Sequence, residues 1–359
     1  MEQPGAPLFR GGWGGLAALF GLTGWGGLLI LLLLLVACNH DRGVENPVPS
    51  IYYWRTTLSL DSTERAFLAQ HGVGRMYVRY FDVVMRDGAP MPNATLVFAD
   101  TLPSDIEVVP TVFIVENCMQ HNLDSVAGLL VDRVVQMNET NGLPAPRELQ
   151  IDCDWTRNSQ DAYFAFLRQV RRLLGEHDMR LSATIRLHQL AMMPPPVDEG
   201  VLMVYNTGDA TRGGDHNPIL DYRDVQPYLR YVADYDLPLC AAYPIFGWQL
   251  LFGGGQFKAI VRDECLDDTT RFSPLGAGEW LVVHSGELPL RSDMGIEMTH
   301  MSVGDHVRVW QPSAGEITRV AQALAQQRPS INDQVVLYHL DSKYLNKYDN
   351  KFYETIYHP

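Results

Sequence analysis

The chain has 359 residues, with 28 Lys and Arg against 42 Asp and Glu, which gives a formal net charge of −14. Hydrophobic residues make up 46% of the chain and charged residues only 19%. This balance excludes a disordered or collagen-like chain and is ample for a large buried core. The acidic excess argues against a nucleic-acid-binding protein, because such proteins normally carry basic patches.

The N-terminal segment is the most apolar part of the chain. Residues 11–37 carry no charged side chain, and a stretch of this length can cross a bilayer as a helix. The tetrapeptide that follows, LVAC at 35–38, resembles the bacterial lipobox, in which the signal peptide is removed and the cysteine is lipidated. The resemblance implies a signal peptide at 1–37, a lipid on Cys38 and a tether at 38–50. An uncleaved membrane anchor is the alternative.

The same resemblance implies a location. A lipid on Cys38 would hold the protein at a membrane of the bacterial cell envelope. Asn39, which follows the cysteine, favours the outer membrane by similarity to enteric lipoproteins.

The rest of the chain alternates short β-rich runs with helical patterns, which is typical of βα units around a parallel sheet. The predicted strands are 51–57, 75–81, 108–115, 148–155, 180–187, 200–206, 238–245 and 334–340. The predicted helices are 62–71, 122–139, 159–177, 221–235 and 314–327. Asp61 and Glu64 form a capping-box pattern at the start of the first helix.

Eight strands with intervening helices predict an α/β fold, a (β/α)8 TIM barrel that spans residues 51–359. The long interval between the seventh and eighth strands contains β-rich runs of its own, which predicts a β-rich insertion at about 247–312. A doubly wound sheet is the weaker alternative, because no glycine-rich phosphate loop follows the first strand.

The fourth predicted strand carries a group of polar side chains. Strand alternation places Gln150, Asp152 and Asp154 on one face, and Ile151 and Cys153 on the other. Because barrel enzymes carry their chemistry at the C-terminal ends of the strands, we expect the two acids to point into the barrel mouth. Burial of two acids about 6–7 Å apart raises the pKa of at least one of them. Pairing with an interior arginine is the structural alternative.

This strand resembles the DGxDxDxE strand of family 18 glycoside hydrolases, the chitinases and their relatives. Asp152 and Asp154 match the second and third acids of that motif, and the tetrapeptide MVYN at 203–206 is similar to the family's MxYD. Thr156 stands where the family has its proton-donating glutamate, and Asn206 where it has an aspartate. The strand resembles more closely a bacterial family of unknown function with a QxDxD strand, DUF3142, which implies no activity.

The glycoside hydrolase resemblance implies roles for individual residues. Asp154 would act as the acid/base, and Asp152 would tune its pKa. Because Thr156 cannot donate a proton to a leaving oxygen, another carboxyl group is needed, and glycoside cleavage places two of them about 5–10 Å apart. Glu116, after the third strand, is the first candidate, and Asp82 and Asp209 follow.

Other side chains at the strand ends suit a sugar, since aromatic rings pack on its C–H faces and Arg or Asn bonds its hydroxyl groups. The predicted substrate-binding residues are Arg79, Gln150, Arg186, Tyr205, Asn206, Tyr243 and Trp248. Arg79 and Arg186 need acidic partners, and Asp152 and Asp154 are the expected ones. Core packing is the alternative for the aromatic residues.

Three functions remain open on this basis. The first is a glycoside hydrolase-like enzyme acting on polysaccharide or oligosaccharide, and the second is a carbohydrate-binding lipoprotein that has lost the proton donor. The third is a metal-dependent hydrolase using Asp152, Asp154 and either His188 or His339, which no HxH or HExxH spacing supports. We expect no cofactor and no nucleic-acid partner. A second carboxylate that faces Asp154 across an open cleft would favour the enzyme, and a mouth sealed by arginines would favour binding.

Overall fold

A computed structural model describes residues 43–121, 123–212, 214–261, 265–290 and 297–358. The predicted signal peptide and Cys38 lie outside these residues. Within them, no helix combines the length and the apolar character needed to cross a bilayer.

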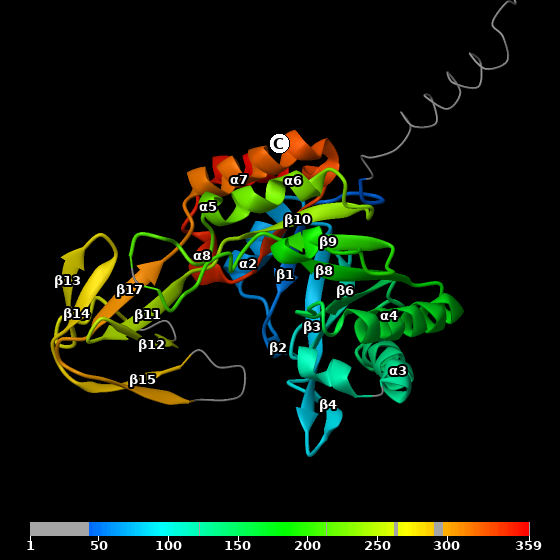
Figure 1. Ribbon diagram of the computed structural model, residues 1–359, viewed down its shortest axis with the longest axis horizontal. Coiled ribbons are helices and arrows are strands. Elements are labelled where there is room, and N and C mark those ends of the chain that lie inside the picture. The colour runs from blue at the N-terminus through cyan, green and yellow to red at the C-terminus, as the bar shows by residue number, and fades with distance from the viewer. Residues whose placement is uncertain (1–42, 122, 213, 262–264, 291–296, 359) are drawn as a thin grey trace, which may run out of the picture. The chain divides into compact units, whose positions relative to one another are not determined.

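Eight parallel strands close into a barrel (Figure 1). They are β1 Ser50–Tyr53, β3 Arg75–Arg86, β6 Glu107–Ile114, β7 Glu148–Asp152, β8 Arg180–Arg186, β9 Glu199–Met203, β10 Leu239–Pro244 and β18 Val335–Tyr338. Their order is β1-β18-β10-β9-β8-β7-β6-β3, and the β1–β3 pairing closes the ring. The predicted (β/α)8 barrel is therefore confirmed, and each observed strand overlaps one predicted strand.

Four of the predicted helices are confirmed. They are α2 Ser62–Gln70, α3 Asp124–Thr140, α4 Gln160–Leu174 and α7 Ala314–Gln327. The capping box opens α2 as expected: the Glu64 backbone N–H donates to the Asp61 side chain, and the Asp61 backbone N–H donates to the Glu64 side chain. In Figure 1, α3 and α4 lie side by side against the barrel.

The predicted helix 221–235 is broken. It divides into α5 Tyr222–Val225, a 3₁₀ turn Gln226–Tyr228 and α6 Leu229–Val232. Pro227 lies in the turn, and a proline removes a backbone donor and clashes with the preceding helical turn. Two short C-terminal helices, α8 Ser342–Leu345 and α9 Asn350–Tyr357, complete the chain and were not predicted.

The crossover between β3 and β6 contains no helix. In its place the chain forms β4 Ala89–Asn93, which pairs with the end of β3, and β5 Val97–Phe98, which pairs with β2 Thr57–Leu58. The remaining crossovers within the described residues use helices or 3₁₀ turns. The 3₁₀ turns not yet named are η1 Glu116–Gln120, η2 Gly175–His177, η3 Leu187–Ala191 and η5 Pro329–Asn332.

A β-rich insertion follows the seventh barrel strand. Its antiparallel sheet has the order β12-β11-β17-β14-β13, formed by β11 Trp248–Gly253, β12 Gln256–Val261, β13 Phe272–Gly276, β14 Glu279–Val282 and β17 His306–Trp310. Strands β15 Gly286–Pro289 and β16 Met298–Met301 pair as a hairpin. The insertion buries an apolar cluster of its own, which includes Leu251, Phe272 and Val307.

The N-terminal segment closes one end of the barrel. Val44 is 7% exposed and belongs to the cluster of apolar side chains inside the barrel. The backbone N–H of Glu45 donates to the Glu199 carboxylate at 3.3 Å, and the Glu45 carboxylate pairs with Arg180 at 3.1 Å. Because Arg180 and Glu199 begin their strands, this end, here called the base, holds the N-terminal ends of the strands. The opposite end, here called the mouth, holds their C-terminal ends.

Candidate functional site

Strand β7 carries the two predicted acids to the mouth. Asp152 ends the strand with a side chain that is 4% exposed, and it accepts a hydrogen bond from Thr184 Oγ1 at 2.6 Å. The Asp154 side chain lies two residues further on and is 55% exposed. Arg186, which ends β8, places Nη2 at 3.6 Å from Asp152 Oδ1 and donates from Nε to Asp154. One guanidinium therefore holds both acids, and the expected pairing of Arg186 is confirmed.

The electrostatics of this trio follow from burial. Burial raises the pKa of Asp152, Arg186 partly offsets that effect, and the neighbouring charges of Asp154 and Asp82 add to it. Burial acts to lower the pKa of Arg186, but attraction to Asp152 and Asp154 outweighs it and the pKa is raised. Arg186 therefore stays cationic and compensates charge that would otherwise be buried alone.

Arg79 has a different partner from the one expected. Its Nε donates to Asp82 Oδ1 at 2.7 Å, and both side chains are buried, at 3% and 6% exposed. The physical reason is a β-bulge between Arg79 and Phe81 in the pairing of β3 with β6. The extra residue shifts the alternation, so that two residues three apart lie on one side of the strand. Asp82, rather than Asp152 or Asp154, therefore neutralises Arg79.

Glu116 lies at the start of η1, directly after β6, and is half-buried. Its carboxylate accepts hydrogen bonds from Thr156 Oγ1 at 2.6 Å and Ser159 Oγ at 2.7 Å. These two bonds lower the pKa of Glu116. Thr156, at the position of the proton donor in the resembled motif, thus serves as a hydrogen-bond donor to a neighbouring carboxylate.

Aromatic rings from several barrel strands stack inside the mouth. Tyr205 stacks on Tyr338, with ring centroids 4.6 Å apart, and Trp54 lies 5.9 Å from Tyr338. The Arg79 guanidinium lies over the Trp54 ring at 5.6 Å. Tyr205 is 4% exposed, and its hydroxyl has no hydrogen-bond partner among the described residues.

The insertion adds two tryptophans to this aromatic group. Trp248 on β11 pairs across the sheet with Trp310 on β17, and both are half-buried against the interior cluster. Trp248 is a predicted residue, whereas Trp310 was missed. The β-rich run at 306–310 was the available indication, but no pattern in the sequence places that strand beside β11.

Two predicted substrate-binding residues lie away from the open mouth. Gln150 is fully buried one layer below Asp152, where it accepts from Tyr52 Oη at 2.7 Å. Tyr243 is fully buried on the outer side of β10 and donates to Asn332 Oδ1 at 2.7 Å. Strand alternation explains Tyr243, since its neighbour Ala242 occupies the inner face. These two residues are therefore structural supports, which corrects the expectation that they contact substrate.

The remaining predicted residues lie near the mouth or in its loops. Asn206 follows β9, is exposed and has the left-handed φ of 54° that asparagine tolerates. His188 is exposed and lines a hollow of about 410 Å³ together with Thr156, Arg157, Asn158 and Met192. Across the ranges that the structure describes, no three His, Cys, Asp or Glu side chains form a group that could hold a metal ion.

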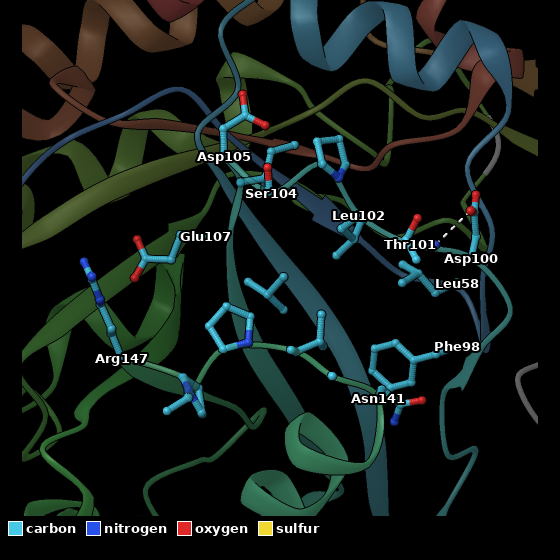
Figure 2. Close-up of a pocket in the computed structure, with 18 residues that line it drawn as sticks. Leu58, Phe98, Asp100, Thr101, Leu102, Ser104, Asp105, Glu107, Asn141 and Arg147 are labelled. Carbon is cyan, nitrogen blue, oxygen red and sulfur yellow. Dashed lines mark hydrogen bonds between the residues drawn. The ribbon is translucent and has the colours of Figure 1, made fainter.

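A separate cavity of about 570 Å³ lies near the base (Figure 2). Its walls come from the segments that lead into β6 and β7, and Figure 2 shows Glu107 and Arg147 toward one end and Phe98 and Asn141 toward the other. None of the predicted site residues lines this cavity. The base end of a barrel normally serves stability, so we place the candidate site at the mouth.

Comparison with solved structures agrees with this architecture. The chain has the fold of chitinases. A chitinase from Chromobacterium violaceum is 15% identical, with a TM-score of 0.51 over 86% of this chain and 98% of that one. Group II chitinase catalytic domain 2 from Ostrinia furnacalis, in complex with penta-N-acetylchitooctaose, is 12% identical, with a TM-score of 0.50 over 88% of this chain and 96% of that one.

These likenesses establish the fold alone. No protein-family model and no curated protein sequence matches the chain. The closer resemblance to DUF3142 is therefore not confirmed, whereas the resemblance to the barrel of chitinases is confirmed at the level of architecture.

Proposed function

We propose that this chain binds a polysaccharide or oligosaccharide at the barrel mouth without cleaving it. The observation that carries the proposal is the set of ion pairs and hydrogen bonds that the carboxyl groups of the mouth make. Arg186 holds both Asp152 and Asp154, and Glu116 is held by the hydroxyl of Thr156. These three acids thus each have a partner within the chain.

Proton transfer argues against turnover. Glycoside cleavage needs one carboxyl group that keeps its proton near the working pH and lies within reach of the leaving oxygen. Glu116 has a lowered pKa, so it is ionised at neutral pH. Asp152 has a raised pKa, but its side chain is 4% exposed, and one of its oxygens, Oδ1, accepts from Thr184. No exposed proton donor therefore stands beside Asp154 among the groups described.

The remaining surface of the mouth suits sugar recognition. Trp54, Trp248 and Trp310 are half-buried and present parts of their rings, and such rings pack on the C–H faces of sugars. The barrel is shared with a chitinase in complex with penta-N-acetylchitooctaose, which supports a carbohydrate ligand by analogy of fold.

Hydrolysis is the second candidate function, and one observation favours it. Asp152 carries a raised pKa directly beside the exposed Asp154. Two neighbouring acids in unlike surroundings, one buried and one exposed, are the usual arrangement for acid/base chemistry. In this alternative, Asp152 would hold the proton and Asp154 would face the substrate.

A panel experiment separates the two functions. The full-length chain in detergent is incubated with bacterial and host polysaccharides, and both retained polysaccharide and new reducing ends are measured. The variants are Asp154→Asn and, as a matched control, Asp178→Asn, which changes an exposed loop acid just before β8 whose φ of 56° asparagine tolerates.

The proposal predicts saturable retention without new reducing ends, weakened by Asp154→Asn and unchanged by the control. New reducing ends that disappear in Asp154→Asn would establish the hydrolase. A chain that retains none of the polysaccharides would contradict both functions.

We further propose that a lipid on Cys38 tethers the barrel to the outer membrane. Val44, within the predicted tether 38–50, is buried; Cys38 and Gly43 are five residues apart, so the part of the tether before Val44 reaches at most about 17 Å. Mass spectrometry of the N-terminal peptide tests the lipid. The proposal predicts diacylated Cys38 and release of Cys38→Ser from membranes, and an intact N-terminal segment would contradict it.

A further inference from the structure

Among the residues that the structure describes, the mouth contains more carboxylates than cations. Its acids are Asp82, Glu116, Asp152 and Asp154, and its guanidinium groups are Arg79 and Arg186. Asp82 forms an ion pair with Arg79, and Arg186 forms ion pairs with both Asp152 and Asp154. Glu116 is bonded to two hydroxyl groups, which carry no charge. An excess of negative charge therefore remains.

The charges at the rim do not remove this excess. Arg308 lies 3.4 Å from Glu279 and Arg212 lies 3.2 Å from Asp209, so each of these cations is offset by an acid. Arg157 is exposed in the hollow beside Thr156 and adds one cation. Even with Arg157 counted, the carboxylates in the described part of the mouth outnumber the cations.

A buried polar group without a partner lies in the same place. The hydroxyl of Tyr205 is buried and has no hydrogen-bond partner within the described part of the chain. Tyr205 is two residues beyond Met203, which pairs with Arg186 across β8 and β9, and both Met203 and Tyr205 belong to the interior cluster. Buried polar groups are normally bonded, and a ligand in the mouth would supply the missing partner of this hydroxyl.

We infer that the ligand is a glycan with free, protonated amino groups, such as a glucosamine polymer. This inference rests on the proposed function and names its ligand class. An ammonium group would compensate the excess charge of the exposed Asp154 and the half-buried Glu116 and bond to them. It would also be attracted to the faces of the aromatic rings in the mouth. An N-acetylated sugar brings no charge, and a uronic acid adds to the repulsion.

Three oligomers of equal length test the inference by titration into the full-length chain in detergent with a chelator present. They are the β-1,4-linked hexamers of glucosamine and of N-acetylglucosamine, and a hexamer of a uronic acid. We expect the glucosamine hexamer to bind at least about tenfold more tightly than the other two at low salt. The preference should shrink as salt rises and as the amines lose their protons.

Variants connect the preference to the mouth. Asp154→Asn and Glu116→Gln each keep the shape of the side chain and remove one negative charge. Each should reduce the preference for the glucosamine hexamer several-fold, whereas Asp178→Asn should leave it unchanged. Circular dichroism and thermal unfolding confirm that each variant is folded.

The outcomes separate the inference from the proposed function. Equal or tighter binding of the N-acetylated or acidic hexamer would overturn the inference and leave carbohydrate binding in place. An amine preference that survives both variants would also overturn it, because the charge of the mouth would not be its source. Failure of all three hexamers to bind would overturn both.

Discussion

The base and the mouth of the barrel both bury charged side chains, but the two ends differ in how completely their polar groups are enclosed and paired. At the base, Glu148 and Glu199 lie near Arg75 and Arg180, and Val44 closes the end. At the mouth, Asp154 remains 55% exposed and the Tyr205 hydroxyl has no partner among the described residues. The base is thus sealed by the chain's own N-terminal segment, whereas the mouth is left incomplete.

This difference separates charges that serve folding from charges that are available to a ligand. In a (β/α)8 barrel, the C-terminal ends of the strands carry function and the N-terminal ends carry stability. Both ends of this barrel follow that division. Substitutions at the base should therefore alter stability alone, and substitutions at the mouth should alter binding, together with stability where they leave a buried charge unpaired.

Loss of Arg186 should have the largest effect, because it removes the partner of a buried acid. We expect Arg186→Met to lower the free energy of unfolding by about 3–5 kcal/mol at pH 7. The defect should shrink in acid, where Asp152 is protonated and needs no partner. Urea unfolding at pH 7 and pH 4 measures both.

The double variant Arg186→Met with Asp152→Asn should recover most of the loss, since the unpaired charge is gone. Arg171→Met, which removes an exposed arginine paired with Asp198, should cost less than about 1 kcal/mol. Equal losses of unfolding free energy in Arg186→Met and Arg171→Met would mean that the ion pairs of Arg186 contribute no more to stability than an exposed ion pair does.

Glu148 should make the base sensitive to pH. Burial and the charge of Glu199 raise the pKa of Glu148 from 4.5 to about 7. Because the pKa is raised in the folded state, the ionised form opposes folding. Its effect on stability is absent below pH 4.5 and grows as pH rises toward 7. The difference between the pKa values in the unfolded and folded states lowers the free energy of unfolding by about 3 kcal/mol above pH 7.

Glu148→Gln should remove this pH dependence, because an amide does not titrate in this range. The amide oxygen still accepts the hydrogen bond from Ser182, so that contact is kept. The variant should unfold at higher urea than the wild type at pH 8 and at similar urea at pH 4. Parallel pH profiles of the two proteins would show that Glu148 is not the titrating group. Glycan binding should be the same in both.

Val44 should contribute a smaller, purely structural term. Val44→Ala removes two methyl groups from the interior cluster and should cost about 1–2 kcal/mol. Val97→Ala, at a position that is 59% exposed, should change stability by less than about 0.5 kcal/mol. A Val44→Ala variant as stable as Val97→Ala would mean that the N-terminal segment does not seal the base.

Tyr205→Phe should have the smallest effect on stability among these mouth and base variants, in contrast to Tyr52→Phe. Tyr205→Phe removes a hydroxyl without a described partner, so its unfolding free energy should change by less than about 0.5 kcal/mol, while glycan affinity falls several-fold. Tyr52→Phe leaves Gln150 without its donor and should cost about 1–3 kcal/mol. Unchanged glycan affinity in Tyr205→Phe would remove the hydroxyl from the binding site.

The sequence was sufficient for the barrel because its strands are separated by clear helical patterns. It also placed Asp152 and Asp154 together, since alternation along β7 follows directly from residue order. It was not sufficient for Arg79, because a β-bulge changes which residues share a face and leaves no pattern. The burial of Tyr243 was equally hidden, since both faces of β10 are apolar and either phase of alternation fits.

The break in the predicted helix 221–235 was, by contrast, visible in the sequence as Pro227. Trp310 illustrates a different limit. Its place beside Trp248 depends on the pairing of β11 with β17, which are separated by more than fifty residues. Contacts of this kind depend on tertiary structure, which local patterns do not determine.

The central claim is that the mouth binds glycan without cleaving it. The most direct test is titration of the full-length chain with the glucosamine and N-acetylglucosamine hexamers, followed by mass spectrometry of each hexamer after prolonged incubation. The account predicts saturable binding, weakened in Asp154→Asn, and recovery of the intact hexamer. Shorter oligomers in molar excess over the protein, formed by the wild type and absent with Asp154→Asn, would contradict it.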